Sequence, residues 1–224
     1  MTKETEIILE GLKKGDQIGG PYELSKILSN SLEANNGFNK DDLIARYLTW
    51  WQDGAFDTGP TYASVFTKLL NGYNHEDAVF KTHNDFDENT AGCGPAHRCT
   101  PLAGFIKIPT NELAAIAKQE AKITHFHEDA GNGSAIVVLM CRYLLEGKTI
   151  DAACRAISFN NDLKESWKKV ENGKLSSDGY VYNVIHSALY FIKNNKTLEE
   201  SIKFSGKANY SSIIFSVLKE IIST

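Results

Sequence analysis

The first segment able to do chemistry is a glycine-rich turn at residues 15–23, which reads Gly-Asp-Gln-Ile-Gly-Gly-Pro-Tyr-Glu. Its glycines permit backbone turns that a side chain would obstruct, and it carries two carboxylates, Asp16 and Glu23. A carboxylate can act as a general base on a water molecule. The spacing alone equally fits a plain helix connection, with Asp16 as a capping residue and Glu23 on the surface.

A second group of oxygen atoms follows in the segment Phe-Asp-Thr-Gly-Pro-Thr at residues 56–61. Asp57, Thr58 and Thr61 offer the carboxylate and hydroxyl ligands that Mg²⁺ prefers. The alternative is that Thr58 or Thr61 only caps the helix that begins here.

The third segment, residues 90–103, combines two exposed backbone positions with a cation. Gly92 and Gly94 leave their amides bare, and Arg98 carries a planar guanidinium suited to phosphate. Further along, His125 in the segment Thr-His-Phe-His can contact a ligand or exchange a proton, or can be a structural histidine.

Zinc is an alternative reading of the same region. Cys93, His97 and Cys99 are potential ligands, and His125 or His127 could supply the fourth. Their spacing is not one of the common zinc-finger spacings, and buried thiols with a packing histidine explain the residues as well.

The elements that must position these segments are helices. Apolar residues recur at helical spacing in most of the chain, and no segment alternates apolar and polar residues as a half-buried strand does. Gly72 is placed to end one helix, Thr149 to begin another, and Thr197 with Glu200 has the spacing of a capping box. We expect an all-α fold of about ten helices forming a single domain over residues 1–224.

Composition narrows the class of protein. The 224 residues are 42% hydrophobic and 23% charged, with a formal charge of −4, which fits a globular chain without a basic face for nucleic acid. No apolar run approaches the roughly 20 residues that span a bilayer, and the first residues contain no apolar signal core. Four dispersed cysteines suggest free thiols, as in a reducing compartment. From the cysteines, the charge and the lack of long apolar runs together, we expect a cytoplasmic protein that binds neither membrane nor nucleic acid.

Taken together and in order, three of these segments resemble the ADP-ribosylglycohydrolase family. They are Gly15-Asp16-x-x-Gly19-x-x-Tyr22-Glu23, then Gly92-Cys93-Gly94 with Arg98 and Pro101-Leu102, and then Thr124-His125 before a long helix of small residues. The resemblance extends from residue 7 to about residue 215. It implies an orthogonal all-α bundle, an activity that removes ADP-ribose from a side chain or small molecule, and usually two Mg²⁺ ions.

The resemblance also implies roles for particular residues. Glu23 matches an acidic residue that acts on the attacking water, and Asp57 is the second expected catalytic carboxylate. Asp57 and Thr58 are the expected metal ligands, for at most one Mg²⁺ ion. The residues expected to contact the ligand are Gly92, Gly94, Arg98 and His125. The implied partner is ADP-ribose or an ADP-ribosylated protein.

The chain departs from the family pattern at its C-terminal metal motif. The family's two metal-binding carboxylates fall on Lys207 and Asn209, which replaces two negative charges by one positive charge. Repulsion between that lysine and a dication weakens a two-metal site by several kcal/mol at separations of about 4 Å. Two functions therefore follow: a hydrolase that works with at most one ion, or an ADP-ribose-binding protein that has lost turnover.

Overall fold

The computed structural model describes residues 1–224 and consists of helices joined by loops. In chain order they are α1 (Lys3–Gly15), α2 (Gly20–Asn35), α3 (Lys40–Gln52), α4 (Pro60–Leu70), α5 (His75–Asp85), α6 (Gly94–Arg98), α7 (Pro101–Gly104), α8 (Thr110–Ala121), α9 (Glu128–Leu145), α10 (Ile150–Ser158), α11 (Lys164–Glu171), α12 (Val181–Lys193), α13 (Leu198–Ser205), the 3-10 helix η1 (Gly206–Ala208) and α14 (Tyr210–Ile222). The all-α fold is confirmed. The fourteen α-helices exceed the expected number, and two of them, α6 and α7, are only five and four residues long.

Local side-chain chemistry sets several helix ends. Thr149 accepts a hydrogen bond from the Ala152 amide at 3.3 Å, and Thr197 and Glu200 form the reciprocal capping box. Gly72 has a φ of +86°, which is the left-handed conformation expected after a helix. These three predictions are confirmed, and a side-chain cap of this kind is worth about 1 kcal/mol.

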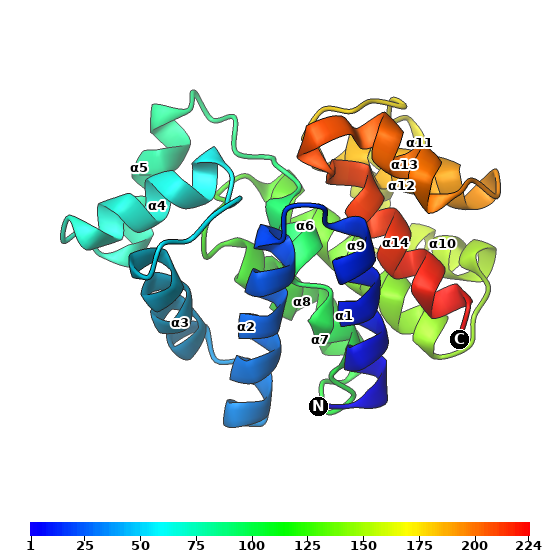
Figure 1. The fold of residues 1–224 in the computed structure, drawn as a ribbon, viewed down its shortest axis with the longest axis horizontal. Helices are drawn as coiled ribbons and strands as arrows, with labels where there is room; N and C mark the ends of the chain where they lie inside the picture. The colour runs from blue at the N-terminus through cyan, green and yellow to red at the C-terminus, as the bar shows by residue number, and fades with distance from the viewer.

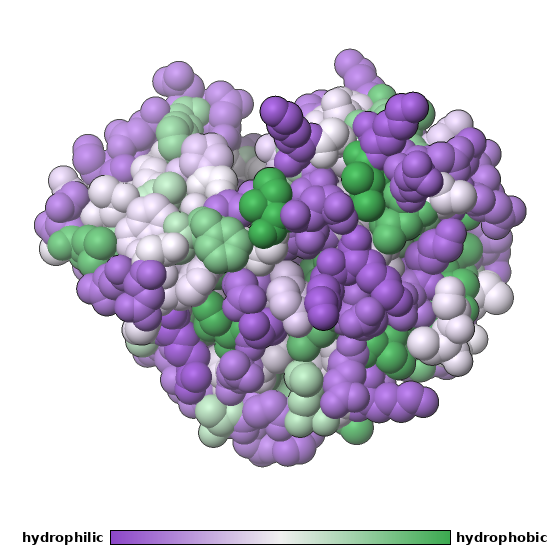
Figure 2. Space-filling model, in the orientation of Figure 1, coloured by the Kyte–Doolittle hydropathy of each residue, from purple (hydrophilic) through white to green (hydrophobic).

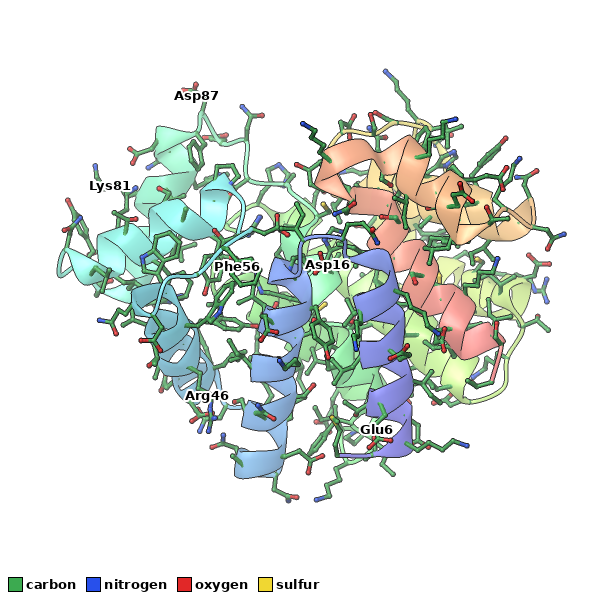
Figure 3. The ribbon with its side chains drawn as sticks, viewed as in Figure 1. Glu6, Asp16, Arg46, Phe56, Lys81 and Asp87 are labelled. Carbon is green, nitrogen blue, oxygen red and sulfur yellow. The ribbon has the colours of Figure 1, made fainter.

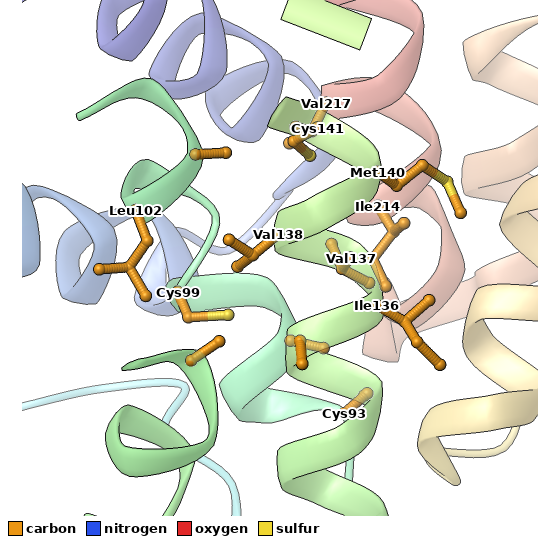
Figure 4. Close-up of a cluster of buried hydrophobic side chains, with 14 of the residues drawn as sticks. Cys93, Cys99, Leu102, Ile136, Val137, Val138, Met140, Cys141, Ile214 and Val217 are labelled. Atoms are coloured by element: carbon orange, nitrogen blue, oxygen red, sulfur yellow. The ribbon is translucent and has the colours of Figure 1, made fainter. Parts of the chain in front are cut away.

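Helix α9 lies at the centre of the hydrophobic core. Fourteen of its eighteen residues are buried, and it packs against α6, α7, α8, α10 and α14. Figure 4 shows aliphatic side chains of α9 among Leu102 of α7, Ile214 and Val217 of α14, and the cysteines that flank α6. A helix that is buried on all sides needs apolar or small residues all round, and α9 has them except at Asp129 and Arg142, whose charged groups are hydrogen-bonded. None of the helices combines the length and the apolar character needed to cross a bilayer.

Helices α1 and α14 run side by side in opposite directions (Figure 1). Their close approach depends on Gly11 and Gly15, because a Cβ at Gly11 would lie 2.7 Å from the Cα of Val217 and one at Gly15 would lie 2.7 Å from the Cβ of Ser216. The Ser212 hydroxyl donates to the Gly15 carbonyl at 3.2 Å. This packing holds the glycine-rich turn after α1 against the start of α14.

Candidate functional site

A pocket of about 420 Å³ opens where the loops before α4, α6, α12 and α14 meet. Figure 2 shows the surface hollowed between the α4–α5 side and the α13 side of the molecule. The pocket is lined by Pro21, Asp57, Thr58, Gly59, Pro60, Thr61, Tyr62, Asn89, Ala91, Gly92, Cys93, Gly94, His97, His125, Gly179, Tyr180, Ala208 and Tyr210. The four segments singled out in the sequence therefore meet at one place, although not with every predicted residue.

Asp16 organises the turn between α1 and α2. Its carboxylate accepts hydrogen bonds from the amides of Ile18 at 3.2 Å, Gly19 at 2.8 Å and Tyr22 at 2.9 Å. These are amides that a helix start leaves without partners, so Asp16 fixes where α2 begins. With its oxygens engaged in this way, Asp16 positions the turn, as the capping interpretation of the sequence predicted.

Two glycines let this turn press against the loop before α4. Gly19 has a φ of +111°, and a Cβ at Gly20 would lie 2.7 Å from the backbone oxygen of Phe56. Figure 3 shows Asp16 and Phe56 on these neighbouring loops. These two glycines therefore allow the close contact between the loops that places Asp57 at the pocket.

Asp57 is the one carboxylate among the pocket-lining residues. Its backbone is in the left-handed region with a φ of +51°, a conformation that aspartate and asparagine tolerate better than most residues. Partial burial raises the pKa of Asp57 above its usual value, the neighbouring Asp16 carboxylate adds to the rise, and the Gly20 amide partly offsets it. A raised pKa makes this carboxylate a better proton acceptor than an ordinary surface aspartate.

Thr58 and Thr61 do not cap α4. The N-cap residue is Gly59, with no side-chain cap, so the capping interpretation of these two threonines is wrong. Both residues line the pocket beside Asp57. The oxygen-rich segment predicted from the sequence therefore faces the pocket, while the helix start relies on Pro60 in its first turn.

Gly92 and Gly94 lie over the imidazole of His125. A Cβ at Gly92 would sit 3.3 Å from Nε2 of His125, and one at Gly94 would sit 3.7 Å from Cε1. The absence of side chains at these positions leaves this edge of the ring open to the pocket. His125 is 6% exposed, and burial lowers its pKa well below the usual value, with the positive charge of Arg98 adding to the effect. The ring is therefore neutral at neutral pH.

Arg98 does not reach the pocket, which corrects the prediction that it contacts the ligand. The side chain is 2% exposed, and Nε donates to Oε1 of Glu120 at 2.6 Å. The guanidinium also lies 5.6 Å from the centre of the Tyr47 ring. Burial lowers the pKa of Arg98, but the negative charge of Glu120 raises it by more, so the pKa lies above its usual value. A basic residue near a glycine loop suggested phosphate, and the acidic partner 22 residues away gave no local signal.

Glu23 is not among the pocket-lining residues either. Both of its carboxylate oxygens lie 2.9 Å from the ammonium group of Lys26, one turn along α2. The side chain is 34% exposed, and an exposed pair of this kind is worth only about 0–1 kcal/mol. The predicted role of Glu23 as the base therefore requires it to leave Lys26, whereas Asp57 already faces the pocket.

Another part of the pocket wall, residues 179–180, belongs to a segment that sequence reasoning missed. The Cys93 amide donates to the Gly179 carbonyl at 3.0 Å, and the Val181 amide donates to the Ala91 carbonyl at 3.1 Å. Tyr180 between them donates its hydroxyl to Asp129 at 2.8 Å. The Asp-Gly pair at 178–179 is a turn signal, but nothing in it indicates a strand-like contact with residues nearly 90 positions earlier.

The zinc alternative is wrong. No group of three or more His, Cys, Asp or Glu side chains comes close enough to hold a metal ion. His97 bonds through Nε2 to the Tyr210 carbonyl at 2.8 Å, and Cys99 contacts the Ser134 carbonyl at 3.9 Å. All four cysteines are free and buried, as the dispersed spacing suggested.

The residues present do not fit a pair of Mg²⁺ ions. Asp16 is engaged by three amides, Asn209 is a buried residue with a φ of +53° at the start of α14, and Lys207 is exposed. Asp57, with Thr58 beside it, is the one carboxylate left in the pocket. Mg²⁺ sites with one protein carboxylate exist, and they rely on water and substrate phosphate for the remaining ligands. An ion at Asp57 and Thr58 stays a prediction.

The chain is similar in sequence and in fold to known proteins. An ADP-ribosylglycohydrolase family profile matches residues 14–209. The ADP-ribosyl-[dinitrogen reductase] glycohydrolase of Rhodospirillum rubrum is 26% identical over 184 residues, which is 80% of this chain and 58% of that protein. A solved structure titled ADP-ribosylglycohydrolase-related protein complex shares the fold, with a TM-score of 0.77 and 19% identity over 98% of this chain and 87% of that one. The chain belongs to the ADP-ribosylglycohydrolase family.

Proposed function

We propose that this protein hydrolyses the glycosidic bond between ADP-ribose and a protein side chain or small molecule. The observation that carries the proposal is the meeting of the Asp57 carboxylate and the open edge of His125 in one pocket, in a chain of this family. The pocket volume of about 420 Å³ lies within the usual range for small-molecule sites. One side of the pocket is open, which leaves room for an acceptor attached to the ribose.

The pocket supports binding of the nucleotide part. Gly92 and Gly94 bring backbone close to a ligand without a side chain in between, and backbone amides suit the oxygens of a diphosphate. Tyr180 and Tyr210 add aromatic surface to the pocket lining. Aromatic side chains favour flat ring systems such as a nucleobase by stacking.

Asp57 is the proposed base, because it lines the pocket and its pKa is raised. In the step, the oxygen of water bonds to C1 of the ribose as the bond from C1 to the leaving group breaks. Asp57 takes a proton from the water, and the leaving group keeps the electron pair and takes up a proton. Cleavage of this kind passes through an oxocarbenium-like state, which a nearby carboxylate stabilises.

A second function is favoured by the charge change at the C-terminal motif. Lys207 and Asn209 stand where the family pattern has carboxylates, and Asp57 is left as the one pocket carboxylate. The alternative is an ADP-ribose-binding protein with no turnover. It predicts binding of the free nucleotide and no release of ADP-ribose from any conjugate.

Release of ADP-ribose from an ADP-ribosylated arginine substrate tests the proposal, measured with Mg²⁺ and with EDTA. Asp57→Asn is the test variant, because asparagine tolerates the left-handed backbone at this position. Glu23→Gln is the matched control for an acidic residue outside the lining. We expect Asp57→Asn to lower the rate by about 100-fold or more, in the range of a lost general base, and Glu23→Gln to lower it far less. Equal turnover in Asp57→Asn and wild type would contradict the role of Asp57, and no turnover by wild type on arginine, serine or small-molecule conjugates would favour the binding protein.

A further inference from the structure

A chain of buried polar side chains leads from the core to His125. Glu120 is fully buried and binds Nε of Arg98 at 2.6 Å. Nη2 of Arg98 lies 2.9 Å from Oγ1 of Thr124, and that oxygen lies 2.7 Å from Nδ1 of His125. The other ring nitrogen, Nε2, has no hydrogen-bond partner in the protein and lies at the pocket beside Gly92.

The chemistry of the donors and acceptors fixes which atom donates in each hydrogen bond of this series. Arg98 can only donate, so Thr124 accepts from it. The Thr124 hydroxyl then has one hydrogen of its own to place, and no acceptor other than Nδ1 of His125 is within hydrogen-bond distance. A buried hydroxyl hydrogen without an acceptor costs about 1–3 kcal/mol, so Thr124 donates to Nδ1. A neutral imidazole whose Nδ1 accepts carries its hydrogen on Nε2.

We propose that Glu120, Arg98 and Thr124 are positioning residues that hold His125 in the Nε2–H tautomer, so that it donates a hydrogen bond to a ligand oxygen in the pocket. The identity of that ligand, ADP-ribose, rests on the proposed function, whereas the tautomer does not. Arg98 thus serves the site without touching the ligand. Its positive charge and its donor group make Nδ1 an acceptor, and the neutral ring becomes a donor on its open side.

The tautomer can be read directly from nitrogen-15 NMR of the histidine rings in the ligand-free wild-type protein, with His125→Gln to assign the signal. We expect a protonated Nε2 and an unprotonated Nδ1. Thr124→Val keeps the shape of the side chain and removes its hydroxyl, and Thr124→Ser keeps the hydroxyl. Thr100→Val is the control, because Thr100 is equally buried and its hydroxyl donates to the His97 carbonyl, which is not part of the hydrogen-bonded series from Glu120 to His125.

Thr124→Val should give a mixture of tautomers and bind ADP-ribose about two- to tenfold more weakly, as expected for one lost hydrogen bond. Thr124→Ser should restore the single tautomer and the affinity, and Thr100→Val should leave both unchanged. A wild-type ring protonated on Nδ1 would overturn the proposal, and so would a Thr124→Val protein with wild-type tautomer and affinity. If wild type binds no ADP-ribose, the proposed function fails, while the wild-type tautomer still decides the inference.

Discussion

A substitution at Gly92 should weaken ligand binding without destabilising the fold. The backbone at Gly92 does not have a positive φ, so alanine is allowed there. The added Cβ would lie 3.3 Å from Nε2 of His125, in the space between that nitrogen and the pocket. Gly92→Ala should therefore block the hydrogen bond that His125 offers to a ligand, while the fold remains.

The expected size follows from the interaction that is lost. A hydrogen bond to a charged group such as a diphosphate is worth about 1.5–3 kcal/mol, which corresponds to roughly 10- to 100-fold in affinity. Replacing glycine by alanine at an allowed backbone position changes stability by about 0.4–1 kcal/mol in the favourable direction, and the contact with His125 offsets part of that gain. The free energy of unfolding of Gly92→Ala should therefore differ from that of wild type by less than about 1 kcal/mol.

The assay is calorimetric titration of ADP-ribose into Gly92→Ala, beside urea unfolding of the same preparation. Gly131→Ala is the matched control, because Gly131 lies outside the pocket lining and its Cβ would meet Lys118 at an ordinary contact distance of 3.6 Å. We expect weak binding for the first variant and a change of no more than a few-fold for the second. Wild-type affinity in Gly92→Ala would refute the reasoning that the open edge of His125 faces the ligand.

Three further predictions concern the core and the pocket wall. Glu120→Gln leaves Arg98 as an uncompensated buried charge, so we expect a loss of about 3–5 kcal/mol in urea unfolding. Burial lowers the pKa of His97 to about 4, so the unfolded chain binds more protons below pH 6.5, and this histidine should cost about 1.4 kcal/mol of stability per pH unit between 6.5 and 4. A His97→Gln variant should flatten that part of the stability profile. Tyr180→Phe removes the hydrogen bond to Asp129, and hydrogen exchange at the amides of the pocket wall should speed up while the core amides stay protected.

The sequence predicted the helices well because their signals are local. The capping box at Thr197 and Glu200 and the left-handed Gly72 depend on residues a few positions apart, and both are present. Asp16 likewise acts on amides two to six residues away. Where the partner is near in sequence, spacing and side-chain chemistry were sufficient.

The site was predicted less completely because its contacts join distant residues. Arg98 looks like a phosphate ligand until Glu120 is found beside it in the core. Glu23 stays a predicted base, and its ion pair with Lys26, three residues along α2, is a local contact that the spacing could have indicated. Tyr180 carries no motif, and it belongs to the pocket only because the segment at 179–181 pairs with residues 91–93. Such arrangements depend on tertiary packing, which residue spacing does not specify.

The most direct test of the central claim is titration of ADP-ribose into the wild-type protein, first with Mg²⁺ and then with EDTA. The claim is that side chains and backbone of this pocket bind ADP-ribose without a two-metal site. We therefore predict saturable binding in both buffers with similar affinity. No binding in either buffer would contradict the claim, whereas binding only with Mg²⁺ would contradict the predicted equal affinity and make the single ion expected at Asp57 and Thr58 a requirement for binding.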